Sequence, residues 1–229
     1  MSDITNRVQR IKARLHELAP DHSVAIMAVT KTRSRVEGIQ ALNAGVALIG
    51  ENRVQESLAK WTPKPDAPLH FIGHLQTNKV KYAIRHFDAI DSVDTEKLAT
   101  TINESLQTMD YSGRFPVMLQ VNGGQESSKS GFDPDLDTMR RFLGHAEHWD
   151  HLLFTGLMAL FPRPADTSLT EIQRIRHLMK ETGELWRMCQ LEGYPWAPLE
   201  DLSMGMTQDY EWAVEAGSTM IRMGSGLFG

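Results

Sequence analysis

Short apolar runs alternate with longer amphipathic runs along this sequence. About eight of the apolar runs are short enough and apolar enough to be buried strands, namely SVAIMAV, VALIGE, HFIGH, AIDSV, FPVMLQV, LLFTGLMA, DLSMG and TMIRMG. Helical patterns lie between them, including residues 95–109, 133–149 and 168–190, and Ser34 with Glu37 forms a capping-box pattern after the first strand. Strands that alternate with helices in this way indicate parallel β-α-β units.

About eight such units in 229 residues predict an α/β fold, a single (β/α)8 barrel of the TIM type that occupies residues 1–229. The first segment predicts an amphipathic helix, because its apolar residues step by four and three at Ile4, Val8, Ile11, Leu15 and Leu18. No helix is expected after the last strand, so we expect the N-terminal helix to fill that gap in the outer ring. A doubly wound open sheet would usually carry a G-x-G-x-x-G first turn, and the first turn here is TKTRS.

Composition excludes several classes of protein. The net charge is −5 and is spread along the chain, unlike the basic surface of a nucleic-acid-binding protein. No apolar run approaches the roughly 20 residues that cross a bilayer, and the charged N-terminus lacks a signal-peptide core. Cys189 is the single cysteine, which excludes a disulfide framework and a cysteine-based zinc cluster. We expect a cytoplasmic protein with no metal site and no nucleic-acid or membrane partner.

The first strand ends in Val29-Thr30-Lys31, and active sites of such barrels lie at the C-terminal ends of the strands. Strand alternation places Lys31 on one face with Ala25, Met27 and Val29, so its neighbours there are apolar. Lys31 could be an ordinary surface lysine. It could also be a partly desolvated amine that forms a Schiff base with an aldehyde or ketone.

The ends of the last two strands are rich in glycine and serine. Ser203 and Gly205 stand where the seventh strand gives way to a helix, and Gly224, Ser225 and Gly226 follow the eighth strand. The loops after these two strands are the common phosphate site of the fold, because backbone N–H groups and hydroxyls donate to phosphate. Gly and Ser also fill ordinary turns, so the prediction depends on both loops lying opposite the strand-end lysine.

Arg222 lies within the otherwise apolar last strand, on the same face as Met220. A buried guanidinium needs an acceptor or an anion, and either a salt bridge to an acidic residue or the ring nitrogen of a bound heterocycle would satisfy it. Asn52 follows the second strand in IGENRVQE, where it is either a helix cap or a polar contact to a ring substituent.

These residues together indicate one cofactor. A lysine for an aldehyde, a phosphate cradle and an arginine for a pyridine nitrogen predict pyridoxal 5′-phosphate (PLP). A cofactor-free Schiff-base aldolase acting on a phosphorylated sugar is the alternative, because the same barrel and loops would support it. Colour separates the two, since a PLP aldimine absorbs visible light and an aldolase does not.

The chain also resembles the pyridoxal phosphate homeostasis protein family, in the segments AVTKTRS, GENRVQE, HFIGHLQTNKVK, VNGGQESSKSGF and SMGMTQDYEWAVEAGSTMIRMGSGLFG. The resemblance implies the barrel of the alanine racemase N-terminal domain, a PLP protein of fold type III, with PLP held as an aldimine on Lys31. It also implies a ring contact from Asn52 and a contact between Arg222 and the pyridine nitrogen. The phosphate contacts that it implies come from Ser203, Gly224 and Ser225. Arg33 departs from the family pattern, in which a lysine is frequent.

The resemblance implies a role in intracellular PLP (vitamin B6) homeostasis without efficient turnover. Alanine racemases bring a second base, a tyrosine, from an additional domain and a dimer partner. This sequence ends at Gly229, just after the phosphate loop, so we expect no such domain. A cation at the ring nitrogen also disfavours its protonation and weakens the electron sink. We expect a monomeric, non-catalytic PLP-binding protein, with PLP-dependent apo-enzymes as candidate partners; the alternative is a PLP-dependent amino-acid racemase or lyase.

Overall fold

The computed structural model describes residues 3–124, 130–162 and 168–229. Parallel strands close a barrel in sequence order, and the first strand pairs with the eighth. The strands are β1 (Ala25–Val29), β2 (Leu48–Glu51), β3 (Leu69–Phe71), β4 (Ala89–Val93), β5 (Phe115–Val121), β6 (Leu152–Ala159), β7 (Asp201–Ser203) and β8 (Met220–Met223). The predicted (β/α)8 barrel is confirmed.

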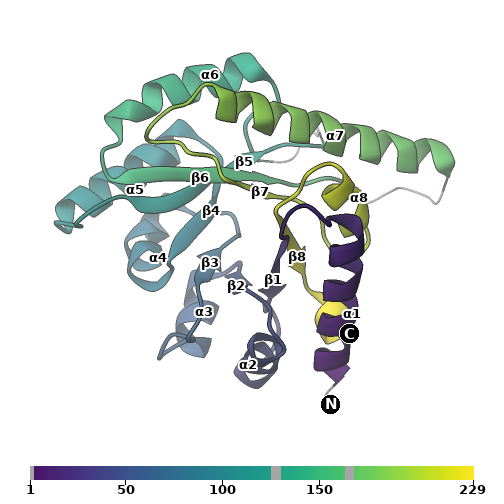
Figure 1. The fold of residues 1–229 in the computed structure, drawn as a ribbon. Coiled ribbons are helices and arrows are strands. Elements are labelled where there is room, and N and C mark those ends of the chain that lie inside the picture. Colours follow the sequence, from purple (N-terminus) through teal and green to yellow (C-terminus); the bar gives the residue numbers. More distant parts are fainter. Residues whose placement is uncertain (1–2, 125–129, 163–167) are drawn as a thin grey trace.

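Helices cover the outside of this barrel (Figure 1). They are α1 (Asp3–Leu18), α2 (Arg35–Asn43), α3 (Val54–Lys60), α4 (Val80–His86), α5 (Glu96–Thr108), α6 (Leu136–His145), α7 (Leu169–Leu191), α8 (Tyr210–Glu215) and α9 (Ser225–Phe228), with 3-10 turns η1 (Thr77–Lys79) and η2 (Ala146–His148). Ser34 caps α2 in the predicted capping box, in which its hydroxyl accepts from the Glu37 N–H and the Glu37 carboxylate accepts from the Ser34 N–H.

Two helical details differ from the sequence-based expectation. Residues 133–149 are not one helix, because Asp135 caps α6 and the helix tightens into η2 after His145. The last strand does have a helix after it, since the single turn α9 follows it with Gly224 at the N-cap position. The helix α1 still occupies the expected place in the ring, where it contacts α2, α8 and α9. Arg14 fixes it there through two hydrogen bonds of 3.0 and 2.8 Å to the Glu211 carboxylate.

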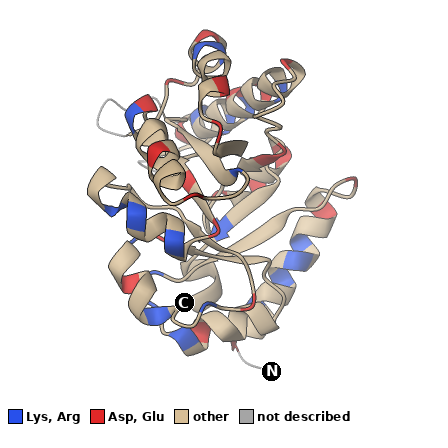
Figure 2. Ribbon diagram, turned by 90° about the vertical axis from the view of Figure 1, so that its left-hand side faces the viewer, with Lys and Arg blue, Asp and Glu red and all other residues tan. Residues whose placement is uncertain are grey.

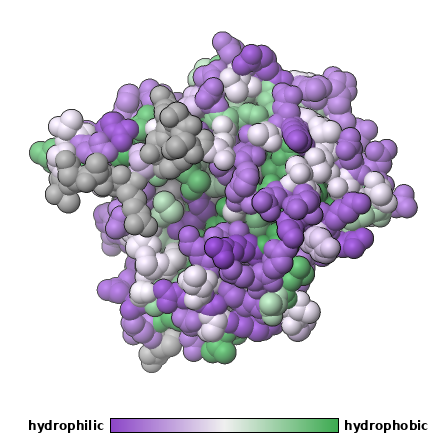
Figure 3. All heavy atoms as spheres, turned by 180° about the vertical axis from the view of Figure 1, so that it is seen from behind, coloured by the Kyte–Doolittle hydropathy of each residue, from purple (hydrophilic) through white to green (hydrophobic). Residues whose placement is uncertain are grey.

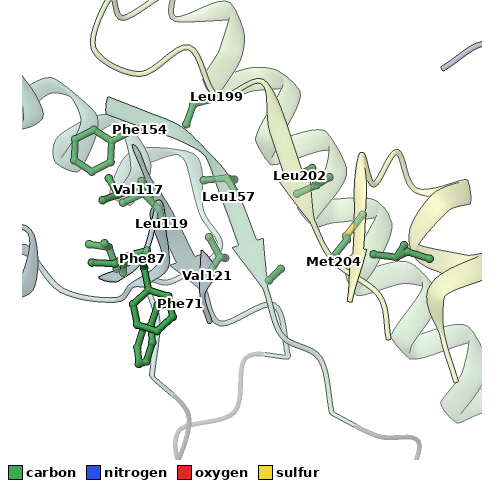
Figure 4. Close-up of a cluster of buried hydrophobic side chains, with 14 of the residues drawn as sticks. Phe71, Phe87, Val117, Leu119, Val121, Phe154, Leu157, Leu199, Leu202 and Met204 are labelled. Carbon is green, nitrogen blue, oxygen red and sulfur yellow. The ribbon is translucent and has the colours of Figure 1, made fainter. Parts of the chain in front are cut away.

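The apolar residues form two layers on either side of the strands. The barrel interior is filled largely by flexible methionines and a leucine, namely Met27, Leu48, Met118, Met158 and Met220. The larger layer lies between strands and helices, and Figure 4 shows part of it, including the Phe71 and Phe87 rings, whose centroids are 5.1 Å apart. Alternation along each strand therefore sends polar residues at strand ends either into the barrel mouth or under a helix.

The surface is predominantly polar. Lys and Arg are interspersed with Asp and Glu over the outer helices (Figure 2), and smaller apolar areas lie between polar ones on the rear face (Figure 3). Within the part of the chain that the structure describes, none of the helices combines the length and the apolar character that a membrane span requires.

Candidate functional site

A cavity of about 380 Å³ lies at the C-terminal ends of the strands. Its size is in the usual range of small-molecule sites, roughly 300–1,000 Å³. The structure brings five of the six predicted site residues to its wall, namely Lys31, Asn52, Arg222, Gly224 and Ser225. Apolar side chains complete the wall, including Val29, Ile72, Met158 and Leu160. The cavity thus combines an apolar lining with a few converging polar groups.

Lys31 lies at the mouth of this cavity and is exposed. The partly desolvated amine that strand alternation suggested is therefore not found, because β1 ends at Val29 and a turn carries Lys31 beyond the strand. The next residue, Thr32, has φ = 62° and its hydroxyl donates to the Lys31 carbonyl over 2.5 Å. A β-branched residue in the left-handed region costs about 1–2 kcal/mol, so the turn holds Thr32 in an unfavourable conformation directly beside Lys31.

Arg222 is buried and makes hydrogen bonds only to neutral oxygens. Its Nη1 donates to the carbonyl and hydroxyl oxygens of Ser203 over 2.7 and 2.8 Å, and its Nη2 donates to the Ala159 carbonyl over 2.8 Å. No carboxylate of the described residues is close enough to Arg222 for a salt bridge. Burial lowers the pKa of Arg222 to about 10, although Asp91 and Asp209 oppose this shift. A guanidinium has five N–H donors, so three acceptors leave Arg222 able to serve a further one.

Ser203 does not line the cavity. It is fully buried, and both of its oxygens accept hydrogen bonds from Arg222. Its position in the structure is therefore behind Arg222, where it holds the guanidinium in place.

The side chain of Asn52 makes no helix cap, so that interpretation is wrong. The cap position of α3 belongs to Arg53, and no side chain donates to or accepts from the helix end there. The Asn52 Oδ1 atom is buried at the cavity and has no hydrogen-bond partner. Gly73 packs against the Asn52 backbone so closely that an added Cβ would lie 2.2 Å from the Asn52 carbonyl oxygen. Asn52 is thus held tightly while its amide oxygen stays unsatisfied, which is costly unless a ligand donates to it.

Thr207 joins the two loops that the sequence predicts to bind phosphate. Its Oγ1 accepts from the Gly226 N–H over 3.0 Å and from the Ser225 hydroxyl over 3.4 Å. Among the described residues, no acceptor lies within hydrogen-bond reach of the backbone N–H groups of Thr207 and Gln208. Ser225 begins α9, where N–H groups have no intrahelical acceptor. Both loops therefore present backbone donors to one end of the cavity, as an anion site requires.

Thr207 was missed as a site residue because its role depends on a contact between loops 18 residues apart. The neighbouring Asp209 is buried and accepts from the Met206 N–H over 2.6 Å, which shapes the first of these loops. Burial raises the pKa of Asp209.

A second polar group, the pair of His70 and Asp91, lies inside the barrel. The His70 Nδ1 is 3.0 Å from Asp91 Oδ1, and Asp91 is fully buried. Burial acts to lower the pKa of His70, but the Asp91 charge and hydrogen bond outweigh it, so the pKa is raised. Asp91 comes from β4, so the spacing of residues within β3 gives no indication of this partner. The described residues include no group of three or more His, Cys, Asp or Glu side chains placed to hold a metal ion.

The raised pKa of His70 predicts a pH dependence of stability. A group with a raised folded pKa contributes its full stabilisation below its unfolded pKa, near 6.5, and loses it as pH rises through the folded value. The His70→Asn variant keeps a donor for Asp91 but does not titrate. We expect the free energy of unfolding of the native chain, relative to His70→Asn, to fall as pH rises above about 6.5. Denaturant titrations at a series of pH values measure this, and parallel pH profiles would contradict it.

Comparisons with known proteins show what this chain is similar to. Residues 2–229 match the family model of the alanine racemase N-terminal domain. A pyridoxal phosphate homeostasis protein from Pasteurella multocida is 37% identical over 216 residues, which cover 92% of this chain and 88% of that protein. The solved structure of PipY from Synechococcus elongatus with PLP bound is similar with a TM-score of 0.81 at 31% identity, over 99% of this chain and 100% of PipY.

Alanine racemase from Clostridium difficile shares the fold, with a TM-score of 0.75 at 15% identity over 98% of this chain and 56% of the racemase. Part of one resembling segment, VNGGQESSKSGF, lies outside the described residues, at positions 125–129. The match of the family model to nearly the whole chain, together with relatives above 30% identity, shows that the chain belongs to the pyridoxal phosphate homeostasis protein family, which has the fold of the alanine racemase N-terminal domain.

Proposed function

We propose that this chain binds PLP in the cavity and serves in intracellular PLP homeostasis without efficient turnover. The observation that carries the proposal is that one cavity collects an exposed lysine amine, an unsatisfied amide oxygen and an arginine with spare donors, beside two donor-rich loops. PipY, which is similar over its whole length, has been solved with PLP bound.

The residues present fit PLP. When bound, PLP supplies an aldehyde that reacts with amines and a pyridine ring that stabilises negative charge on carbon. Arg222 would donate a spare N–H to the ring nitrogen, and Asn52 Oδ1 would accept from a donor on the ring. The phosphate would accept hydrogen bonds from the backbone N–H groups of Thr207, Gln208 and Ser225. Gly224 leaves open space beside these groups, because a Cβ added there would meet only one atom, at 4.0 Å.

Lys31 is proposed as the covalent attachment point. Its Nζ, once deprotonated, would add to the aldehyde carbon and form a carbon–nitrogen double bond, with the aldehyde oxygen leaving as one water molecule. Exposure at the mouth lets the amine reach an incoming or departing ligand without a rearrangement of the barrel. An exposed amine at the cavity mouth therefore suits a site that must both capture and release PLP.

The residues that line the cavity also favour binding without racemisation. All four tyrosines of the chain are among the described residues, and none lines the cavity. Arg222 is a cation at the proposed position of the ring nitrogen, so it disfavours ring protonation and weakens the electron sink without abolishing it. We therefore propose holding and release rather than turnover, in place of a PLP-dependent racemase or lyase.

The test uses the purified full chain and PLP. We expect a visible absorption band that survives removal of free PLP and is lost on borohydride reduction, and no turnover above background with a panel of amino acids. A colourless protein after removal of free PLP would contradict PLP binding. Racemisation or elimination at enzyme-like rates would contradict the absence of turnover.

Asn52 offers a prediction that separates folding from binding. Its Oδ1 has no protein partner, so Asn52→Leu removes a buried unsatisfied atom and should raise the free energy of unfolding of the PLP-free protein by up to about 1 kcal/mol. The same change removes a proposed ligand contact and should weaken PLP binding about tenfold, which corresponds to 1.4 kcal/mol. Denaturant unfolding and PLP titration measure the two effects. A variant that is more stable and binds PLP as tightly as the native chain would contradict the assignment of Asn52.

The proposal extends to partners and compartment. A protein that holds PLP without consuming it must release it, so PLP-dependent apo-enzymes are the proposed recipients. The proposed state is a monomer. A single buried thiol, Cys189, suits the reducing cytoplasm.

A further inference from the structure

A buried ion pair lies directly behind the cavity. Glu51 is fully buried, and its Oε1 accepts from Lys60 Nζ over 2.8 Å, from the Thr30 hydroxyl over 2.6 Å and from Trp61 Nε1 over 3.1 Å. Lys60 Nζ also donates to the backbone carbonyl of Thr30 over 2.6 Å. We refer to Glu51, Lys60, Thr30 and Trp61 as the Glu51–Lys60 clamp.

Two members of the clamp directly precede proposed PLP contacts in the sequence. Thr30 precedes Lys31, and Glu51 precedes Asn52. Strand alternation sends the side chains of Thr30 and Glu51 outward, where they meet the end of α3, while Lys31 and Asn52 line the cavity. The clamp therefore joins the ends of β1 and β2 at the positions where the chain enters the site.

The clamp also fixes the peptide group that leads into Lys31. The Thr30 carbonyl accepts from Lys60 Nζ and from the Arg33 N–H, the latter over 3.0 Å, and the Thr30 N–H donates to Gly50 over 3.1 Å. Because a peptide group is planar, a fixed Thr30 carbonyl also fixes the direction in which the backbone of Lys31 continues. The side chain of Lys31 is exposed, so its reach depends on this backbone more than on side-chain packing.

The energetics indicate a role other than stability. Removing two charges from water costs several kcal/mol each, and an apolar pair of similar volume is often as stable or more stable. Glu51 Oε2 adds to that cost, since it is buried without a hydrogen-bond partner. A buried, directional pair is better explained by the geometry that it specifies.

We propose that the Glu51–Lys60 clamp is a positioning device that holds Lys31 in a fixed placement relative to Asn52 and so sets how fast the Lys31 amine captures the PLP aldehyde. This inference rests on the proposed function, in which Lys31 is the attachment point. Small misplacements of reacting groups slow reactions by factors of up to about a hundred.

The test compares Thr30→Val, which keeps the shape of the side chain but loses the hydroxyl, with Thr30→Ser, which keeps the hydroxyl. Thr182→Val is the matched control, since Thr182 is also buried and donates to the Leu178 carbonyl over 2.9 Å, in α7. Measurements are the initial rate of PLP attachment at Lys31, by borohydride quenching and mass spectrometry, the amide hydrogen exchange of residues 30–33 in the PLP-free protein, and thermal stability.

We expect Thr30→Val to slow attachment about tenfold and to speed exchange at residues 30–33, and Thr30→Ser to restore both. Thr182→Val should keep the native attachment rate even where its thermal stability falls. The double variant Glu51→Gln with Lys60→Met leaves no unpaired charge and should slow attachment further. If the double variant does not fold, the attachment rate of Thr30→Val alone tests the positioning role.

The outcomes separate the two proposals. If the native chain forms no adduct at Lys31, the proposed function fails. If the native chain forms the adduct and the clamp variants match its rate, the positioning role is overturned. The positioning role is also overturned if the attachment rate falls in proportion to thermal stability across all variants, including Thr182→Val.

Discussion

Lys31→Ala is expected to abolish the PLP adduct that borohydride fixes on the native chain. Lys31 is the one lysine that lines the cavity among the residues that the structure describes. The nearby Lys60 is engaged by Glu51 and the Thr30 carbonyl, so its amine is not directed to the cavity. Intact-mass measurement after reduction, followed by peptide mapping, should show one phosphopyridoxyl group on Lys31 of the native chain and none on the variant.

The control for this prediction is Lys81→Ala, which removes an exposed lysine of α4 that lies outside the cavity and should leave the adduct unchanged. Lys31→Ala should still bind PLP non-covalently, because Arg222, Asn52 and the two loops remain. Its visible spectrum should then resemble that of free PLP. An adduct of native yield on Lys31→Ala would show that another amine holds the cofactor and would remove the central assignment.

The fold was predictable from the sequence because its signals are local. Runs such as FPVMLQV and LLFTGLMA coincide with β5 and β6, and the Ser34 capping box marks the start of α2 where it was expected. Periodicity and capping depend on residues within a few positions of one another. The helix α9 was not predicted, because a single turn of four residues has no periodicity to detect.

The polar contacts of the site depend on residues that are distant in sequence, so they could not be predicted in the same way. The sequence placed Arg222 on one face of the last strand with Met220, but the partners of Arg222 come from β6 and β7, at Ala159 and Ser203. Spacing likewise gave no indication that Thr207 bonds to Gly226. Patterns locate a strand end; the closure of the barrel decides which strand ends face each other.

Arg222→Met is expected to destabilise the fold and to weaken PLP binding. Methionine fills much of the same space but donates no hydrogen bond, so the Ser203 and Ala159 oxygens lose their buried donor. Leaving buried acceptors unsatisfied costs about 1–3 kcal/mol each, and we expect a total near 3 kcal/mol after relaxation. For a chain of this length, each kcal/mol lowers Tm by about 2–4 °C, so Tm should fall by roughly 6–12 °C. Calorimetry of the PLP-free protein measures this loss.

A structural role and a ligand role for Arg222 differ in the response to PLP. Ligand binding raises stability in proportion to the logarithm of its concentration over Kd. If Arg222 donates to the pyridine nitrogen, saturating PLP should raise the Tm of Arg222→Met by less than it raises that of the native chain. Arg187→Met is the control, because Arg187 is exposed and makes no hydrogen bond or ion pair in the described structure; both its Tm and its response to PLP should stay native. An equal rise in Arg222→Met and the native chain would leave Arg222 as a structural residue, and the pyridine nitrogen would need another partner.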